Sequence, residues 1–304
     1  MDARRRRDGF ALLAVLWMLG GGVALGALLL LAARDALAIA TNRAALTQAR
    51  WRAEGCLERA RAAVDEDASE VIDDSTWMHL DRVVLISPLV QECALMITPS
   101  GTTLDVNRAS VVQLRRLFAT AGLSAERADS VTSAILDWHD PDDDPRGPGA
   151  ERAWYAAAGR AAPRNGDIGS AEELTTIRGL ESRPAIDSLL GVEHDRIFLA
   201  RAPLPVLASL PGMTPAALAE LERRRVVGDS VTDLTRLAAL VDSASREMLQ
   251  ANASVLGELT TALPDAWVIT ASASAGHPEV TARIEIRVVR SGRRLAIMYR
   301  RSDS

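Results

Sequence analysis

Hydrophobic residues at the start of the chain form one long uninterrupted run. From Phe10 to Ala33 there are 24 consecutive uncharged residues, and a helix of this length measures about 36 Å, enough to cross a bilayer core. Apolar positions then recur at helical spacing to about residue 66, and no proline occurs before Pro88. The pattern therefore predicts one helix of about 55 residues, spanning a membrane in its first part and amphipathic in its second.

The pattern changes to alternation in two places. Residues 89–110 alternate and are rich in β-branched side chains around a Pro99-Ser100-Gly101 turn, which predicts one or two strands. The segments 266–275, 279–289 and 293–301 alternate again and are separated by short turns, which predicts three antiparallel strands. Helical patterns broken by Pro and Gly fill the interval between them. The expected fold class is α+β, with a small antiparallel sheet split by a large α-helical insertion.

Three stretches of the insertion resemble helix-hairpin-helix units. They read LDVNRASVVQLRRLF, SAEELTTIRGL and APLPVLASLPGMTPAALAEL, each with a small polar residue or proline at a helix start. In DNA-binding hairpins a Gly-x-Gly turn offers backbone N–H groups to a phosphate, whereas here Gly212 and Gly179 each lack the second glycine. Arg223, Arg224 and Arg225 are interspersed with glutamates. We expect a structural role and no nucleic-acid partner, and we keep a membrane-tethered DNA-binding protein as the alternative.

An acidic stretch, DWHDPDDDPRGPGAERAWY, carries the clearest candidate chemistry. With Asp140 as position 1, Asp142, Asp144 and Glu151 fall at positions 3, 5 and 12, which is the ligand spacing of an EF-hand loop. Position 6 is Pro145 where an EF-hand has glycine, so the EF-hand turn itself is not expected. Crowded carboxylates repel one another unless a cation neutralises them. The composition therefore predicts weakly bound Ca²⁺, with Glu172 and Glu173, or the side chain of Asn165, completing the ligand shell from a neighbouring segment; the alternative is a solvated acidic turn.

The composition excludes several classes of enzyme. All 35 basic residues are arginine, so Schiff-base, pyridoxal and P-loop chemistry lack their lysine. The four histidines show no paired metal spacing, and neither G-x-S-x-G nor H-E-x-x-H is present. We expect no catalytic residues and no enzyme activity. The two cysteines, Cys56 and Cys93, lack zinc-ligand spacing, and the sequence leaves open whether they form a disulfide.

Charges around the hydrophobic run predict its orientation. Arg4 to Arg7 precede it, and by the positive-inside rule they stay in the cytoplasm while everything after residue 34 lies outside. The run is longer than the hydrophobic part of a cleaved secretory signal, although ALAIA at 36–40 resembles a cleavage site. Gly22 and Gly26 form a G-x-x-x-G pair that permits close helix contact; ordinary membrane glycine is the alternative.

The basic leader followed by Gly9, Phe10 and a long hydrophobic helix resembles the type IV prepilin class. The resemblance implies that a prepilin peptidase cuts after Gly9 and that Phe10 is then methylated. Most members carry glutamate at the fifth mature position, where this chain has Ala14. That glutamate is thought to meet the terminal amine of the subunit above, because a carboxylate in a membrane needs a partner. A subunit with nothing above it has no such requirement.

The whole set of motifs resembles the minor pseudopilin K family of type II secretion systems. The resemblance rests on Ala14, LDVNRASVVQL, ILDWHDPDDDP, GAE followed by Tyr155, SAEELTTIRGL and the closing strands. It implies a single-pass inner-membrane protein with a periplasmic body, which initiates and caps a pseudopilus for export of folded proteins. The implied partners are the I-type and J-type minor pseudopilins, the major pseudopilin, the prepilin peptidase and the inner membrane, with calcium bound in the insertion.

These observations give a predicted organisation in six segments. They are the leader 1–9, the membrane part of the N-terminal helix 10–33, its periplasmic part 34–66, the first strands of the sheet 67–104, the helical insertion 105–263 and the last strands of the sheet 264–304.

Overall fold

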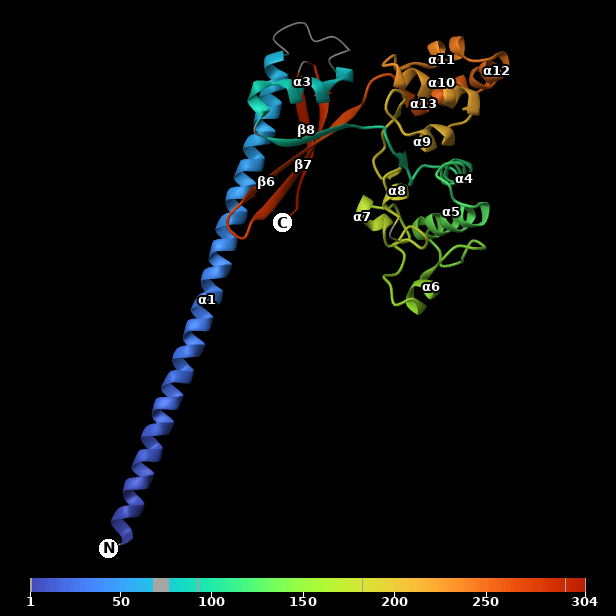
Figure 1. Cartoon of the computed structure of the whole chain (residues 1–304). Helices are drawn as coiled ribbons and strands as arrows, with labels where there is room; N and C mark the ends of the chain where they lie inside the picture. Colours follow the sequence, from blue (N-terminus) through green and yellow to red (C-terminus); the bar gives the residue numbers. More distant parts are fainter. Residues whose placement is uncertain (1, 68–76, 92, 182, 293, 304) are drawn as a thin grey trace.

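The structure is a computed structural model that describes residues 2–67, 77–91, 93–181, 183–292 and 294–303. Its dominant element is helix α1, Asp2–Asp67, which runs continuously for 66 residues. Only its C-terminal part packs against other elements, and the N-terminal part projects alone (Figure 1). The long helix predicted from periodicity is therefore present, and it also includes residues before Phe10.

A four-stranded antiparallel sheet lies along the C-terminal part of α1 (Figure 1). Its order is β1-β6-β7-β8, and the bounds are β1 Ala94–Pro99, β6 Ala266–Ala275, β7 Val280–Ser291 and β8 Arg294–Asp303. One face is buried against the helix, where Ile269, Ile284 and Ile286 meet Leu57 and Ala60 in one core. The alternation of the three C-terminal strands reflects this arrangement, because successive side chains of a strand point to opposite faces.

The stretch predicted to hold the first strands contains mostly helix. Helix α3, Leu80–Ile86, and the 3₁₀ turn η1, Pro88–Val90, precede β1, and residues 68–76 lie outside the described part of the chain. The second predicted strand is β2, Leu104–Asp105, which pairs in parallel with β3, Leu190–Gly191. Of the one or two strands predicted here, β1 therefore joins the main sheet, and β2 pairs with a strand of the insertion.

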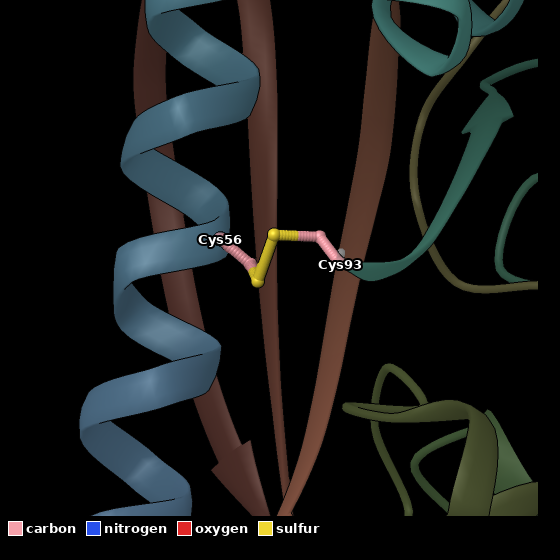
Figure 2. The surroundings of a disulfide bond; sticks show 2 residues. All are labelled: Cys56 and Cys93. Atoms are coloured by element: carbon pink, nitrogen blue, oxygen red, sulfur yellow. A yellow bond between two sulfur atoms is a disulfide. The ribbon is translucent and has the colours of Figure 1, made fainter. Parts of the chain in front are cut away.

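A disulfide fastens α1 to the start of the sheet. Cys56 lies on the sheet-facing side of α1 and Cys93 directly precedes β1, with their Cα atoms 5.6 Å apart (Figure 2). The bond answers the question that the sequence left open. It joins the long helix to the residue before β1, and the two cysteines are 37 residues apart in the sequence.

The helical insertion has its own hydrophobic core. Its helices are α4 Val111–Thr120, α5 Ala125–His139, α6 Arg152–Ala157, α7 Ala171–Leu174, α8 Pro184–Asp187, α9 Leu204–Ser209, α10 Pro215–Val226, α11 Leu234–Leu240, α12 Ser243–Ala251 and α13 Ala253–Leu259. Two short strands, β4 Ile197–Phe198 and β5 Thr260–Thr261, pair in parallel. Caps define several of the helix starts: Ser110 and Gln113 form a capping box at α4, and Asp242 caps α12. Leucines from successive helices share one buried cluster.

Contacts between residues far apart in the sequence hold the insertion beside the sheet. Gly101 has a φ of +76°, and a Cβ there would lie 2.1 Å from the carbonyl oxygen of Arg196, so only glycine fits this turn. The hydroxyl of Ser100 accepts a hydrogen bond of 2.9 Å from the backbone N–H of Ala266. The guanidinium of Arg196 pairs with Asp265 at 2.6 Å. The first bond joins the segment that enters the insertion to the segment that leaves it, and the second joins the insertion itself to the leaving segment.

Candidate metal centre

Helices α5 and α6 present the acidic stretch to the interior of the insertion. Asp137 lies in the last turn of α5, Asp140 is its C-cap, and Glu151 is the N-cap of α6. The loop between them is tied back to α5, because the backbone N–H of Arg146 donates to Asp137 at 3.2 Å. The folding of this loop therefore brings three carboxylates from two helix ends together.

The three carboxylates form a compact, buried cluster. Asp137, Asp140 and Glu151 each offer an oxygen, and these oxygens all lie within 4.8 Å of one another. The exposed fractions of the three residues are 0%, 7% and 3%. Oxygens at this separation can contact one cation together, since Ca²⁺ takes oxygen ligands at about 2.3 to 2.6 Å.

Several buried oxygens in this region have no hydrogen-bond partner among the described residues. They are Oδ1 of Asp140, both carboxylate oxygens of Glu151 and Oδ1 of Asn165. A buried carboxylate left unpaired costs several kcal/mol in principle, on the order of the penalty for any unpaired buried charge. The oxygen-only donor set is the type preferred by hard divalent cations. The residues present therefore fit a calcium ion.

Arg146 and Gly149 shape the cluster. The guanidinium of Arg146 contacts Asp140 and lies 3.6 Å from Asp137, so it supplies part of the positive charge that the carboxylates need. A Cβ at Gly149 would lie 1.9 Å from Oδ2 of Asp137. Glycine is required at this position because the carboxylate packs directly against the backbone.

The electrostatics of the cluster favour a bound cation. Burial, together with the nearby charges of Asp137, Asp140 and Asp143, raises the pKa of Glu151 to about 7. Burial also raises the pKa of Asp137, against hydrogen bonds from the backbone at Arg146 and Ala150. Both carboxyl groups are thus costly to ionise in the folded protein without an added positive charge.

The structure separates the sequence-predicted ligands into two groups. Asp140 and Glu151 lie in the buried cluster, whereas Asp142 and Asp144 are exposed and form their own turn, in which the Asp144 N–H donates to Asp142 Oδ1 at 2.9 Å. The EF-hand spacing therefore does not describe the cluster, because two of its four positions lie in the exposed turn. Asp142 and Asp144 therefore do not join the three-carboxylate cluster.

The two ligands predicted from a neighbouring segment also separate. The Asn165 side chain donates to the carbonyl of Asp142 at 2.8 Å, which places it beside the acidic loop. Glu172 instead lines a cleft with Arg283, Glu285 and Arg301 of the sheet. Glu172 therefore lies outside this cluster and beside the sheet.

Asp137 is the site residue that the EF-hand spacing missed. Its position three residues before Asp140, within an amphipathic helix, places both carboxylates near one end of α5. Apolar neighbours such as Val131, Ile135 and Trp138 are buried on the same helix. An aspartate within that buried pattern is the signal that could have identified it, because a buried aspartate needs a charge partner.

Both helix-hairpin-helix turns are occupied by neighbouring groups of the chain. The N–H of Gly179 donates to the Glu181 carboxylate at 2.6 Å. A Cβ at Gly212 would lie 2.7 Å from the Met248 carbonyl, so that turn packs closely against α12. Neither turn presents its glycine to solvent as a phosphate-binding hairpin does.

The arginines at the end of α10 are paired within the chain. Arg223 and Arg224 both hydrogen-bond Glu220 and lower its pKa to about 2, and Arg225 donates to the carbonyl of Leu199 at 2.6 Å. These contacts leave little free positive charge for a phosphate backbone.

Among the described residues, α1 is the one helix long and apolar enough to cross a membrane. Gly9 and Phe10 lie within the backbone of this helix. At Gly22 and Gly26 a Cβ would meet nothing within 4 Å, and Leu16, Val23 and Leu30 are exposed on the same stretch. Ala14 is half-buried by its own helix. The stretch is therefore an apolar surface without a partner in this chain.

Comparisons with known proteins agree with this architecture. Residues 93–185 match the family model for type II secretion system protein K. A chain of the solved GspK-GspI-GspJ complex from the type 2 secretion system of enterotoxigenic Escherichia coli is similar over 70% of this chain and 80% of that chain, with a TM-score of 0.50 and 13% identity, which shows a shared fold. A search of curated proteins finds no match. The chain therefore contains a segment similar to type II secretion system protein K, residues 93–185, within a fold shared with a chain of that solved complex.

Proposed function

We propose that this protein is a minor pseudopilin of a type II secretion system and that it occupies the tip of the pseudopilus, where it initiates and caps the filament that exports folded proteins across the outer membrane. The observation that carries the proposal is the apolar, unpartnered surface of the N-terminal part of α1. Exposed leucines along a helix of this length need either lipid or sister helices to cover them. A helix that anchors the protein in the membrane and also packs against sister helices would have this surface covered by both.

Two features support a place at the tip. The fifth residue after Gly9 is Ala14, so the helix lacks the membrane carboxylate that would need a subunit above it. The helical insertion projects sideways from the sheet, at the end of the molecule far from the N-terminus (Figure 1). A subunit with such bulk at its distal end suits the last position of a filament better than a repeated position within it.

The processing and location follow from this role. The prepilin peptidase would cleave between Gly9 and Phe10, and the new terminus would be methylated. The helix would cross the inner membrane once, with its arginine leader in the cytoplasm and the body in the periplasm. The Cys56–Cys93 disulfide is compatible with an oxidising compartment. The partners would be the I-type and J-type minor pseudopilins, which accompany GspK in the solved complex, together with the major pseudopilin. The protein would act by assembly and would catalyse no reaction.

The assembly role makes the glycine pair of α1 a testable contact. Gly22→Leu with Gly26→Leu is expected to reduce co-purification with the I-type and J-type pseudopilins about tenfold and to impair secretion, because leucine prevents close approach of a second helix. Membrane extracts of the tagged full chain, co-expressed with both partners, provide the measurement. Gly20→Leu with Gly21→Leu adds the same bulk about 160° away around the helix and is the matched control. Unchanged assembly and secretion in the Gly22 and Gly26 variant would contradict this contact.

Calcium would have a structural role in the insertion. We propose that Asp137, Asp140 and Glu151 form the centre of its ligand set and that Asn165 adds an oxygen from the neighbouring segment. The ion would neutralise the buried carboxylates and hold the ends of α5 and α6 together. An extracellular site of this kind binds with a Kd on the order of 0.1 to 1 mM, which suits a protein exposed to external calcium.

Adding about 5 mM calcium to residues 35–304 is expected to raise stability by about 1 to 2 kcal/mol, as mass action gives for that Kd. The Tm should then rise by several degrees, at about 2 to 4 °C per kcal/mol. Asp140→Asn with Glu151→Gln should abolish the rise, whereas Asp142→Asn with Asp144→Asn removes two charges from the exposed turn and should keep most of it. An equal loss in both variants would indicate that the exposed turn closes over the ion.

DNA binding is less well supported. The glycine turns at Gly179 and Gly212 are occupied by Glu181 and α12, and the arginines of α10 are paired within the chain. A DNA receptor on this fold would need unpaired cations near an open hairpin.

A further inference from the structure

A polar groove runs between the periplasmic part of α1 and the end of β6. It measures about 530 Å³ and is lined by Arg52, Cys56, Arg59, Ala94, Ser272, Ala273 and Ser274. The metal cluster and the hydrophobic contacts of α1 with the sheet do not account for it. The disulfide forms part of its wall, because Cys56 lies between the two arginines on α1.

The charge in this groove has one sign. No acidic side chain is among its lining residues in the described part of the chain. The nearby glutamates of α1 are engaged elsewhere: Glu54 contacts Arg300 of β8 and Glu58 pairs with Arg61 at 3.0 Å. The groove therefore presents uncompensated positive charge.

The two arginines differ in how they are held. Arg52 donates from Nη1 to the carbonyl of Ser274 at 2.7 Å, which fixes its guanidinium at the groove wall and leaves its other N–H groups available. Arg59 is exposed and makes no ion pair or hydrogen bond with any other described residue through its side chain. One arginine is thus already positioned for an anion, and the other is free to reach one.

The spacing of the two arginines defines the shape of the ligand. Seven residues separate Arg52 from Arg59, which is almost two full turns and about 10.5 Å along the helix axis. Both therefore face the same side of α1. On a partner helix lying beside α1, two carboxylates seven residues apart also lie about 10.5 Å apart on one side of the helix. Each of them can accept hydrogen bonds from one of the two guanidinium groups.

We propose that this groove binds an acidic helix of a partner pseudopilin, through two carboxylates placed about two turns apart. The proposal rests on the assembly function proposed above and assigns it a specific contact outside the membrane. Electrostatic complementarity of this kind sets the partner and the register more than it adds affinity. The apolar contacts within the membrane would supply attraction, and the groove would select which helix lies beside α1 and at what height.

The test uses the full-length chain, co-expressed with the I-type and J-type minor pseudopilins and extracted in mild detergent. Arg52→Glu with Arg59→Glu is expected to reduce the amount of partner captured at least about tenfold, because each attraction becomes a repulsion. Capture by the unaltered chain should also fall as salt is raised, since exposed charges are screened. Arg59→Glu alone should give a partial loss, and it breaks no contact within the described chain, so it tests the groove without affecting folding.

Arg43→Glu with Arg50→Glu is the matched control. These two arginines are also exposed and seven residues apart, and they lie about 180° around α1 from the first pair. Normal capture by this control, with loss in the Arg52 and Arg59 variants, supports the proposal. If all variants capture the partner equally, or if the Arg52/Arg59 and Arg43/Arg50 double variants lose capture equally, the proposed groove contact is contradicted while the assembly function is not. If the unaltered chain captures neither partner, the proposed assembly function fails as well.

Discussion

Replacing Cys56 and Cys93 with alanine is expected to lower the free energy of unfolding of residues 35–304 by about 4 kcal/mol. The bond closes a loop between residues 37 apart, and the chain-entropy model gives about 4 kcal/mol for a loop of that length. The location increases the consequence, because the bond joins α1 to the residue preceding β1, and β1 is the one strand of the main sheet that comes from the first half of the described chain.

Urea denaturation followed by circular dichroism measures this effect. The unaltered protein under reducing conditions should behave as the double alanine variant does, which is the internal control for any packing change at Cys56. We also expect the variant to accumulate less in the periplasm, since a loss of this size brings a domain close to its stability limit. A loss below about 1 kcal/mol would contradict the view that this bond is a main support of the sheet.

The metal-free protein is expected to lose stability as pH rises from 4.5 toward about 7, the opposite of ordinary carboxylate behaviour. The pKa of Glu151 rises from 4.5 in the unfolded chain to about 7 in the folded one. Between these values the folded state holds a proton that the unfolded state has released, so proton loss favours unfolding. At about 1.4 kcal/mol per pKa unit the total change reaches about 3 kcal/mol, and the raised pKa of Asp137 acts in the same direction.

Glu151→Gln isolates this effect from other titrating groups. The variant cannot ionise at position 151, so the difference in unfolding free energy between the variant and the unaltered chain should grow in the variant's favour from pH 5 to pH 8 in the presence of a chelator. Saturating calcium should remove most of the loss in the unaltered chain, because the ion stabilises the ionised carboxylate. A difference that does not change with pH would show that Glu151 titrates normally.

The hydrophobic pattern was sufficient to predict the elements with strong local periodicity. The 24-residue apolar run and the helical spacing after it identified α1, and alternation identified β6, β7 and β8. Small polar residues or prolines at helix starts and glycine turns indicated helical units within the insertion. These features depend on contacts within a few residues, so the sequence alone determines them.

The errors occurred where the outcome depended on residues far apart in the chain. Leu104 and Asp105 form a strand, but they pair with Leu190 and Gly191 of the insertion and not with the main sheet, because strand pairing depends on which segments the fold brings alongside. Glu172 has the right chemistry for a calcium ligand, but α7 turns it toward Arg301 of the sheet. The spacing of the acidic residues indicated Asp142 and Asp144 as calcium ligands, whereas the buried carboxylate cluster contains Asp137 in their place.

The order of residues predicts the long apolar helix, the split sheet, the lysine-free body and the acidic stretch. The folded chain shows which carboxylates meet, that Cys56 bonds Cys93, and that Arg52 and Arg59 line an open groove. The physical reason is that periodicity reports which side of an element is buried, whereas a site depends on the distance between side chains from different elements, and packing alone fixes that distance.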